Sequence, residues 1–166
     1  MKNLFLLLTL LFLVLNQVFS QNFEIPKDYS LETASDYEKY EKSIVAAVDW
    51  LIEAPVNSNE SHRKEVNAFL MKWLTGSPSV SIALTTEIAT FMDCGDCLLV
   101  YMGGWAKYVI ETGDNDDKVK ANFAGLESVM TFYQKHKSEL GKNKAIEKYI
   151  KMKAKGKLEA FVESKV

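Results

Sequence analysis

The residues with the clearest chemical capacity are two cysteines, Cys94 and Cys97, which form C-x-x-C in the stretch FMDCGDCLLVYMGGW. Two thiols at this spacing support a structural disulfide, thiol–disulfide exchange or the binding of a soft metal ion. The N-terminus indicates export, as argued below, and exported proteins meet an oxidising environment. These are the only two cysteines of the sequence, so a disulfide between them leaves no cysteine unpaired. We therefore expect a structural disulfide between Cys94 and Cys97, which stabilises the fold by about 2 kcal/mol.

A redox role is the first alternative for this pair. Thiol–disulfide oxidoreductases of the thioredoxin class place C-x-x-C at a helix N-terminus, where the amide dipoles activate a thiolate. The motif here resembles that arrangement, because an apolar run begins at Leu98. The rest of that pattern is missing: no βαβ pattern surrounds the motif, and no proline follows Pro78. Asp96 between the thiols also opposes thiolate formation.

A soft-metal site is the second alternative. Met92, Cys94 and Cys97 form M-x-C-x-x-C, which resembles the copper(I)-binding loop of heavy-metal-associated domains over six residues. The alternating strands and helices of that family are absent from the pattern. The two histidines, His62 and His136, are each isolated in sequence, and a structural zinc needs two ligands beyond the thiols. We expect no cofactor, and the metal site stays an alternative.

The element that follows these cysteines must be buried. Residues 98–110 are apolar on nearly every side, which is typical of a central helix. Gly103 and Gly104 lie in its middle, where each glycine costs about 1 kcal/mol relative to alanine. Two explanations fit Gly103, Gly104 and Trp105: close packing of a neighbouring helix, or a pocket beside a ligand. We expect close packing, the commoner cause.

Helices surround this central one, because apolar residues recur at steps of three and four. One helix begins at Ser35 or Asp36 and ends before Pro55. Another begins near Asn59 or Ser61 and ends at Gly76, and a long one ends near Gly141. The inner stripe of the long helix is expected to contain Val119, Phe123, Leu126, Met130 and Tyr133.

Two further segments complete the predicted fold. Asn143 caps a last helix, which Gly156 bends or interrupts. Residues 80–92 fit two structures, since Val80, Leu84, Ile88 and Phe91 keep helical spacing while β-branched residues also alternate. We expect a helix there, with a short β-hairpin as the alternative. The predicted fold is therefore all-α, a single-domain bundle of five or six helices around a buried central helix.

The N-terminus has the form of a secretory signal peptide. Lys2 precedes an apolar run over residues 4–15, and Val18 and Ser20 occupy the positions before the cleavage site. The run is shorter than the roughly 20 residues that span a bilayer. We therefore expect cleavage of residues 1–20 before Gln21, an irregular lead-in at residues 21–34 and a helical domain at residues 35–166. The mature chain is expected to be periplasmic or secreted, without a transmembrane segment.

Charge is unevenly distributed along the mature chain. Residues 21–134 carry a net charge of −9, and residues 135–166 carry a net charge of +6 from ten lysines and four glutamates. The plain expectation is that these lysines solvate the outer faces of the terminal helices. The alternatives are attraction to the acidic part of the chain, to a partner or to anionic lipid. Nucleic acid is not expected, because the compartment is wrong and the sequence has one arginine, Arg63.

Known catalytic motifs do not occur in the sequence. There is no G-x-S-x-G, H-E-x-x-H or phosphate-binding loop. In overall character the chain resembles small exported helical proteins of Gram-negative bacteria, and it is similar in kind to type VI secretion immunity proteins and acid-stress periplasmic chaperones. We therefore expect an exported, non-enzymatic binding protein of the envelope or periplasm, a monomer or weak oligomer whose partner is another protein. The alternative is a thiol-active or soft-metal-binding protein that uses Cys94 and Cys97.

Overall fold

The computed structural model describes residues 23–166, so the expected signal peptide at residues 1–20 lies outside the described part. Residues 23–166 contain six α-helices and no strand, which confirms the expected all-α bundle. The helices are α2 (Ala34–Glu53), α3 (Glu60–Gly76), α4 (Gly95–Thr112), α5 (Lys118–Leu140), α6 (Lys144–Ala154) and α7 (Leu158–Glu163).

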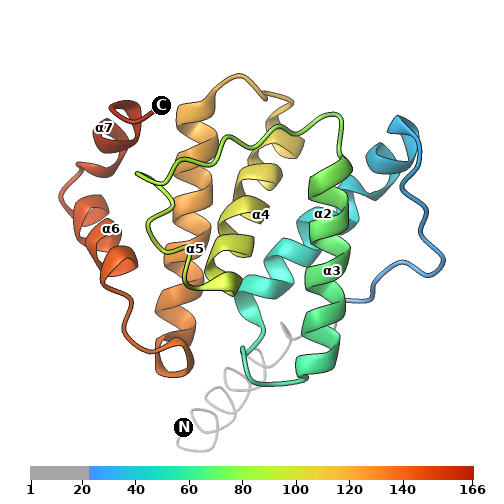
Figure 1. The fold of residues 1–166 in the computed structure, drawn as a ribbon, viewed down its shortest axis with the longest axis horizontal. Helices are drawn as coiled ribbons and strands as arrows, with labels where there is room; N and C mark the ends of the chain where they lie inside the picture. Colours follow the sequence, from blue (N-terminus) through green and yellow to red (C-terminus); the bar gives the residue numbers. More distant parts are fainter. Residues whose placement is uncertain (1–22) are drawn as a thin grey trace, which may run out of the picture.

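Helix α4 is the central helix that the sequence predicts. It lies beside α5 and also contacts α2 and α3 (Figure 1). Ten of its residues are buried, among them Tyr101 and Trp105 with no exposed surface. The apolar run therefore forms the middle of the core, because a helix that is apolar on every side has no face to offer to water.

Short polar side chains begin the surrounding helices. Asn59 and Asn143 accept hydrogen bonds from backbone N–H groups in the first turns of α3 and α6, as the sequence predicts. The first residue outside α2 is Thr33, whereas the sequence suggests Ser35 or Asp36 as the cap. Asp36 instead accepts from the backbone N–H of Thr33 at 2.8 Å, which is the reciprocal arrangement of a capping box.

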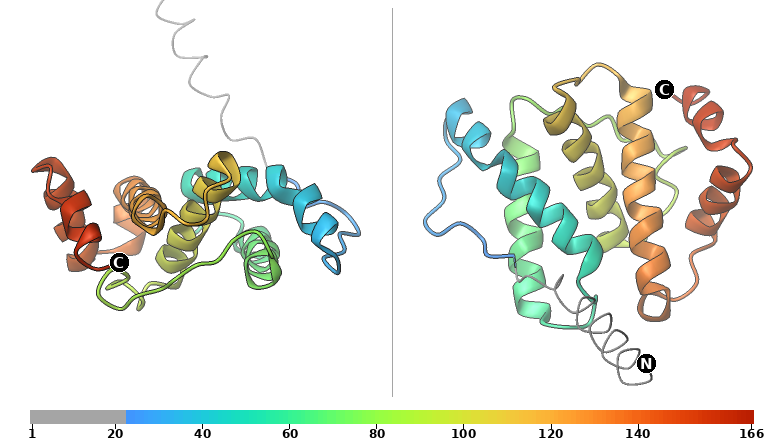
Figure 2. Two further views of the ribbon diagram at one scale, coloured as in Figure 1. Left: turned by 90° about the horizontal axis from the view of Figure 1, so that it is seen from above. Right: turned by 180° about the vertical axis from the view of Figure 1, so that it is seen from behind.

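Two short helices form one edge of the molecule. Among the described helices, α6 contacts only α5 and α7. Gly156 adopts a φ of 62° between them, so the last helix is interrupted there as predicted. The views from the front and from behind both place α6 and α7 at the edge opposite α2 and α3 (Figures 1 and 2).

The segment at residues 77–94 corrects the prediction. The sequence favours a helix near residues 80–92 with a hairpin as the alternative, and the structure has neither there. The reason is that polar groups of other elements satisfy this backbone: Asn115 accepts from the N–H of Ser81 at 3.0 Å, and the Tyr149 hydroxyl donates to the carbonyl of Ile88 at 2.7 Å. Of the four residues with helical spacing, Val80, Ile88 and Phe91 are buried, whereas Leu84 is 41% exposed.

No helix within residues 23–166 is both long and apolar enough to cross a bilayer.

Candidate functional site

The two cysteines lie at the beginning of α4. Cys94 is the residue immediately before the helix, and Cys97 is in its first turn. A disulfide joins them, with Cα atoms 5.2 Å apart, and the sulfur of Cys94 accepts from the backbone N–H of Cys97 at 3.3 Å. Cys97 is completely buried, whereas Cys94 is partly exposed. The bond therefore closes the turn between the irregular segment and the central helix, with one sulfur on the outer side.

The residues considered for a metal site do not converge around these sulfurs. The side chain of Met92 is 43% exposed, and no cluster of three or more His, Cys, Asp or Glu suited to a metal ion occurs in residues 23–166. Both histidines instead bond to backbone carbonyls. The Nε2 of His62 lies 2.8 Å from the oxygen of Phe23, and the Nε2 of His136 lies 2.9 Å from the oxygen of Ile52.

The two glycines of α4 face two different helices. A Cβ built on Gly103 would lie 2.8 Å from Cγ2 of Val48, which belongs to α2. A Cβ built on Gly104 would lie 2.2 Å from Oγ of Ser128, which belongs to α5. Real Cβ atoms do not approach so closely, so both positions exclude a side chain with the neighbours where they are. Trp105 beside them is completely buried.

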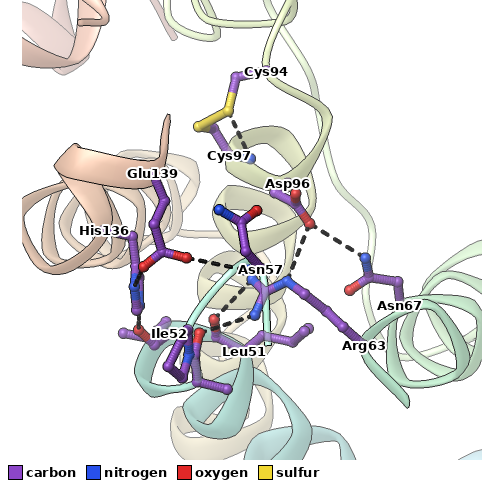
Figure 3. Close-up of polar contacts among 12 residues, drawn as sticks. Leu51, Ile52, Asn57, Arg63, Asn67, Cys94, Asp96, Cys97, His136 and Glu139 are labelled. Atoms are coloured by element: carbon purple, nitrogen blue, oxygen red, sulfur yellow. Dashed lines mark hydrogen bonds and ion pairs between the residues drawn. A yellow bond between two sulfur atoms is a disulfide. The ribbon is translucent and has the colours of Figure 1, made fainter. Parts of the chain in front are cut away.

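A polar cluster next to the disulfide holds four helices together (Figure 3). Arg63, the one arginine of the sequence, is buried and donates to the carbonyl oxygens of Leu51 and Ala54 at 3.1 Å each. Its Nε lies 3.5 Å from a carboxylate oxygen of Asp96, one of the two residues between the cysteines. Burial lowers the pKa of Arg63, and the carboxylate of Asp96 opposes this effect.

The same region connects α5 to the end of α2. Glu139 accepts from the backbone N–H of Asn57 at 2.9 Å, and its carboxylate lies 3.5 Å from Nδ1 of His136 (Figure 3). The Asn57 N–H, and to a smaller extent His136, hold the pKa of Glu139 below its ordinary value. A groove of about 280 Å³ adjoins Arg63 and Asp96. The charged groups of this cluster are already bonded to one another or to backbone, so the cluster acts as a structural clamp.

A second surface has the opposite character, since six of the seven charged side chains that line it have no ion-pair partner in the described part of the chain. A groove of about 490 Å³ follows α6, and Glu147 and Met152 contribute to its lining. The other lining residues are six exposed lysines, which we call the lysine face: Lys142, Lys144, Lys148, Lys151, Lys155 and Lys157.

The lysine face carries uncompensated charge. Across residues 23–166, none of its six ammonium groups lies within 4.0 Å of a carboxylate oxygen, whereas neighbouring lysines do form ion pairs. Lys137 pairs with Glu147 at 2.7 Å, and Lys153 pairs with Glu127 at 2.5 Å. The one carboxylate that lines the groove, Glu147, is thus already neutralised. Attraction to the acidic part of the chain therefore does not account for these six lysines.

Helix α6 presents the lysine face from a fixed position. Ile146 and Tyr149 on its inner side are completely buried, and the two ion pairs to Glu147 and Glu127 connect α5 with α6. Four of the lysines follow one another at steps of four, three and four residues, which puts them on one side of the helix. Like charges at this spacing each cost a few tenths of a kcal/mol. Such a surface can bind anions, and an anion would remove that cost.

Sequence analysis recognised the excess of lysines but not the face that they form. The signal was present in the spacing of Lys144, Lys148, Lys151 and Lys155, which matches the turns of a helix. The buried role of Arg63 gave no signal, because an arginine near the beginning of a polar helix is ordinarily exposed. No protein-family model, curated protein or solved structure matches this chain.

Proposed function

We propose that this chain is an exported protein that works by binding an anionic partner through the lysine face, and not by catalysis. One observation carries the proposal: six exposed lysines line one groove without a carboxylate partner in the described part of the chain. Clustered cations repel one another, and this cost is offset when an anion binds.

The position of the lysines within the helix supports the same conclusion. Lys144 is the first residue of α6, where the positive end of the helix dipole disfavours a cation. Asn143 caps this helix, Tyr149 bonds to residues 88 and 90 of the irregular segment, and Lys153 pairs with Glu127, so α6 is anchored without any help from the lysine face. The lysines are therefore free to meet a ligand, and their backbone is already ordered before binding.

Export remains part of the proposal, on the N-terminal pattern alone. A signal peptide at residues 1–20 would leave a mature chain that begins at Gln21 in the periplasm or outside the cell. Mass spectrometry of the exported protein should find Gln21 at the N-terminus. An intact N-terminal segment on the exported protein would contradict this part of the proposal.

Retention on a cation-exchange resin at neutral pH tests the binding surface. Residues 21–166 carry a net charge of −3, so the resin should hold the mature protein only through a local cationic surface. We expect retention of the wild type and its loss in the variant Lys144→Gln/Lys148→Gln/Lys151→Gln/Lys155→Gln.

The matched control removes the same charge elsewhere. It replaces four exposed lysines outside the lysine face, Lys27, Lys39, Lys42 and Lys72, by glutamine. This control should still be retained. Equal behaviour of the two variants would show that the lysine face has no special affinity for anions, and the proposal would be wrong.

Thiol–disulfide exchange is the second candidate, and a specific geometry favours it. Cys94, a partly exposed residue, directly precedes α4, and its sulfur accepts from the N–H of Cys97, so the same N–H and helix dipole would stabilise a Cys94 thiolate after reduction. Asp96 opposes this effect, although Arg63 lies beside its carboxylate. Catalytic turnover of a dithiol substrate, abolished by Cys94→Ser, would establish this candidate. Absence of turnover in the wild type would reject it.

A further inference from the structure

We infer that the anionic partner of the lysine face is a membrane surface rich in acidic phospholipid. This inference rests on the proposed function, because it identifies the ligand of the same surface. The shape of the charge array, the type of its residues and the position of α6 in the fold each support it.

The lysines form a line rather than a cluster around one point. Lys144 is the first residue of α6 and Lys155 directly follows its last residue, so a rise of about 1.5 Å per residue separates the two lysines by about 16 Å along the helix. Lys142 and Lys157 continue the array beyond both ends of the helix. A charge therefore recurs at roughly every turn. Such a line matches a surface with repeated phosphate groups, whereas a single small ion could contact only part of it.

The type of residue also indicates a diffuse ligand. Arginine recognises a shaped phosphate or carboxylate through its rigid, forked guanidinium, whereas lysine is a flexible point charge. The lysine face contains six lysines and no arginine, and Arg63 is buried in the clamp beside the disulfide. Flexible cations on exposed stems suit the field of a bilayer, in which individual headgroups change place.

The fold orients this face toward an anionic surface. Residues 135–166 have a net charge of +6 with their four glutamates included, whereas residues 21–134 have a net charge of −9. Helix α6 contacts neither α2 nor α3, and α5 lies between α6 and α2, whose residues 34–53 have a net charge of −3; packed helix axes are about 8–10 Å apart (Figure 1).

This arrangement lets a negatively charged protein approach a negatively charged membrane. At physiological salt the Debye length is about 8 Å, so an acidic helix two layers away is largely screened from a surface that touches α6. The charge asymmetry also disfavours an approach through α2. The expected encounter therefore places α6 on the membrane and the acidic α2 away from it.

Vesicle sedimentation with the exported protein tests the inference. We expect binding to vesicles that contain phosphatidylglycerol, little binding to phosphatidylcholine alone and release at high salt. Each lysine near an anionic surface strengthens binding about fivefold. The variant Lys144→Gln/Lys148→Gln/Lys151→Gln/Lys155→Gln should therefore bind several hundredfold more weakly, about fivefold for each lysine that touches the surface. The variant at Lys27, Lys39, Lys42 and Lys72 should bind like the wild type.

Two further experiments distinguish a membrane ligand from other anionic ligands. Inorganic phosphate at moderate concentration should not displace the protein from vesicles; displacement would identify free phosphate as the ligand and overturn the inference. Polyglutamate, as a model acidic polypeptide, should bind more weakly than the vesicles; stronger binding would point to a protein partner instead. If the resin retains the wild type through the lysine face but anionic vesicles do not bind it, the membrane inference fails while the proposed function stands.

Discussion

Replacement of Gly104 by alanine should destabilise the protein, although alanine is the better helix former. A Cβ at this position would lie 2.2 Å from Oγ and 2.6 Å from Cβ of Ser128, and 3.0 Å from the carbonyl oxygen of Ala124. The Cβ of Ser128 is fixed to the backbone of α5 and cannot rotate away, so α4 and α5 must separate locally.

The magnitude follows from two opposing effects. Overpacking of a dense core costs about 1–3 kcal/mol. The change from glycine to alanine in a helix interior stabilises the helix by about 1 kcal/mol. We expect a net loss of up to about 2 kcal/mol, which lowers the midpoint of thermal unfolding by up to roughly 6 °C in a domain of this size.

Urea and thermal unfolding, followed by circular dichroism, measure this loss. Gly95→Ala is the matched control, because no atom lies within 4 Å of its Cβ position at the beginning of α4. The control should keep or slightly raise the stability. In a double-mutant cycle, Ser128→Gly should recover much of the loss caused by Gly104→Ala. A Gly104→Ala protein as stable as the Gly95→Ala protein would refute the close contact of α4 with α5.

The remaining predictions concern the clamp and the disulfide. Arg63→Met should lower the free energy of unfolding by about 2–3 kcal/mol, because two backbone carbonyls and Asp96 lose their hydrogen-bond donor. The control Lys64→Met, on the exposed side of α3, should change the free energy of unfolding by no more than about 0.5 kcal/mol. The pKa of Glu139 is lowered in the folded state, so the stabilisation that its carboxylate gives is present at neutral pH and is lost as the pH falls through that lowered pKa. Glu139→Gln should therefore flatten the acid side of a plot of thermal midpoint against pH. An unchanged plot would contradict this prediction. Replacement of both cysteines by serine should cost about 2 kcal/mol in urea unfolding and leave cation-exchange retention unchanged; lost retention would make the disulfide part of the binding site.

Sequence patterns predicted most of the fold because its helices are locally specified. The apolar run at residues 98–110 became the buried α4, and the caps at Asn59 and Asn143 bound the N–H groups for which their side chains are suited. On α5 the prediction was accurate in part: Leu126, Met130 and Tyr133 of the expected inner stripe are buried, whereas Val119 and Phe123 are only partly buried.

The failures have one physical cause, which is dependence on groups distant in sequence. Residues 77–94 remain irregular because Asn115 and Tyr149 satisfy their backbone, and no local pattern reveals such partners. Gly125 was not recognised either. Its Cβ would lie 2.7 Å from the carbonyl oxygen of Tyr101, so its meaning depends on which helix packs against it.

Of the lysine face, the sequence predicts only the excess of lysines. A C-terminal excess of lysines can be read directly, and the helical spacing is visible once α6 is assumed. What the sequence does not contain is the set of carboxylates near each lysine. Lys137 and Lys153 are paired while their neighbours on the lysine face are not, and only the packing of α6 on α5 determines that difference.

Lysine footprinting with an acylating reagent tests the central claim most directly, because mass spectrometry reports each lysine separately. The protein would be labelled with and without vesicles that contain phosphatidylglycerol. We predict protection of Lys144, Lys148, Lys151 and Lys155 by the vesicles, with unchanged labelling of Lys27, Lys39, Lys42 and Lys72, which are exposed outside the lysine face. Equal protection of both sets, or protection of the second set alone, would contradict a binding surface on α6.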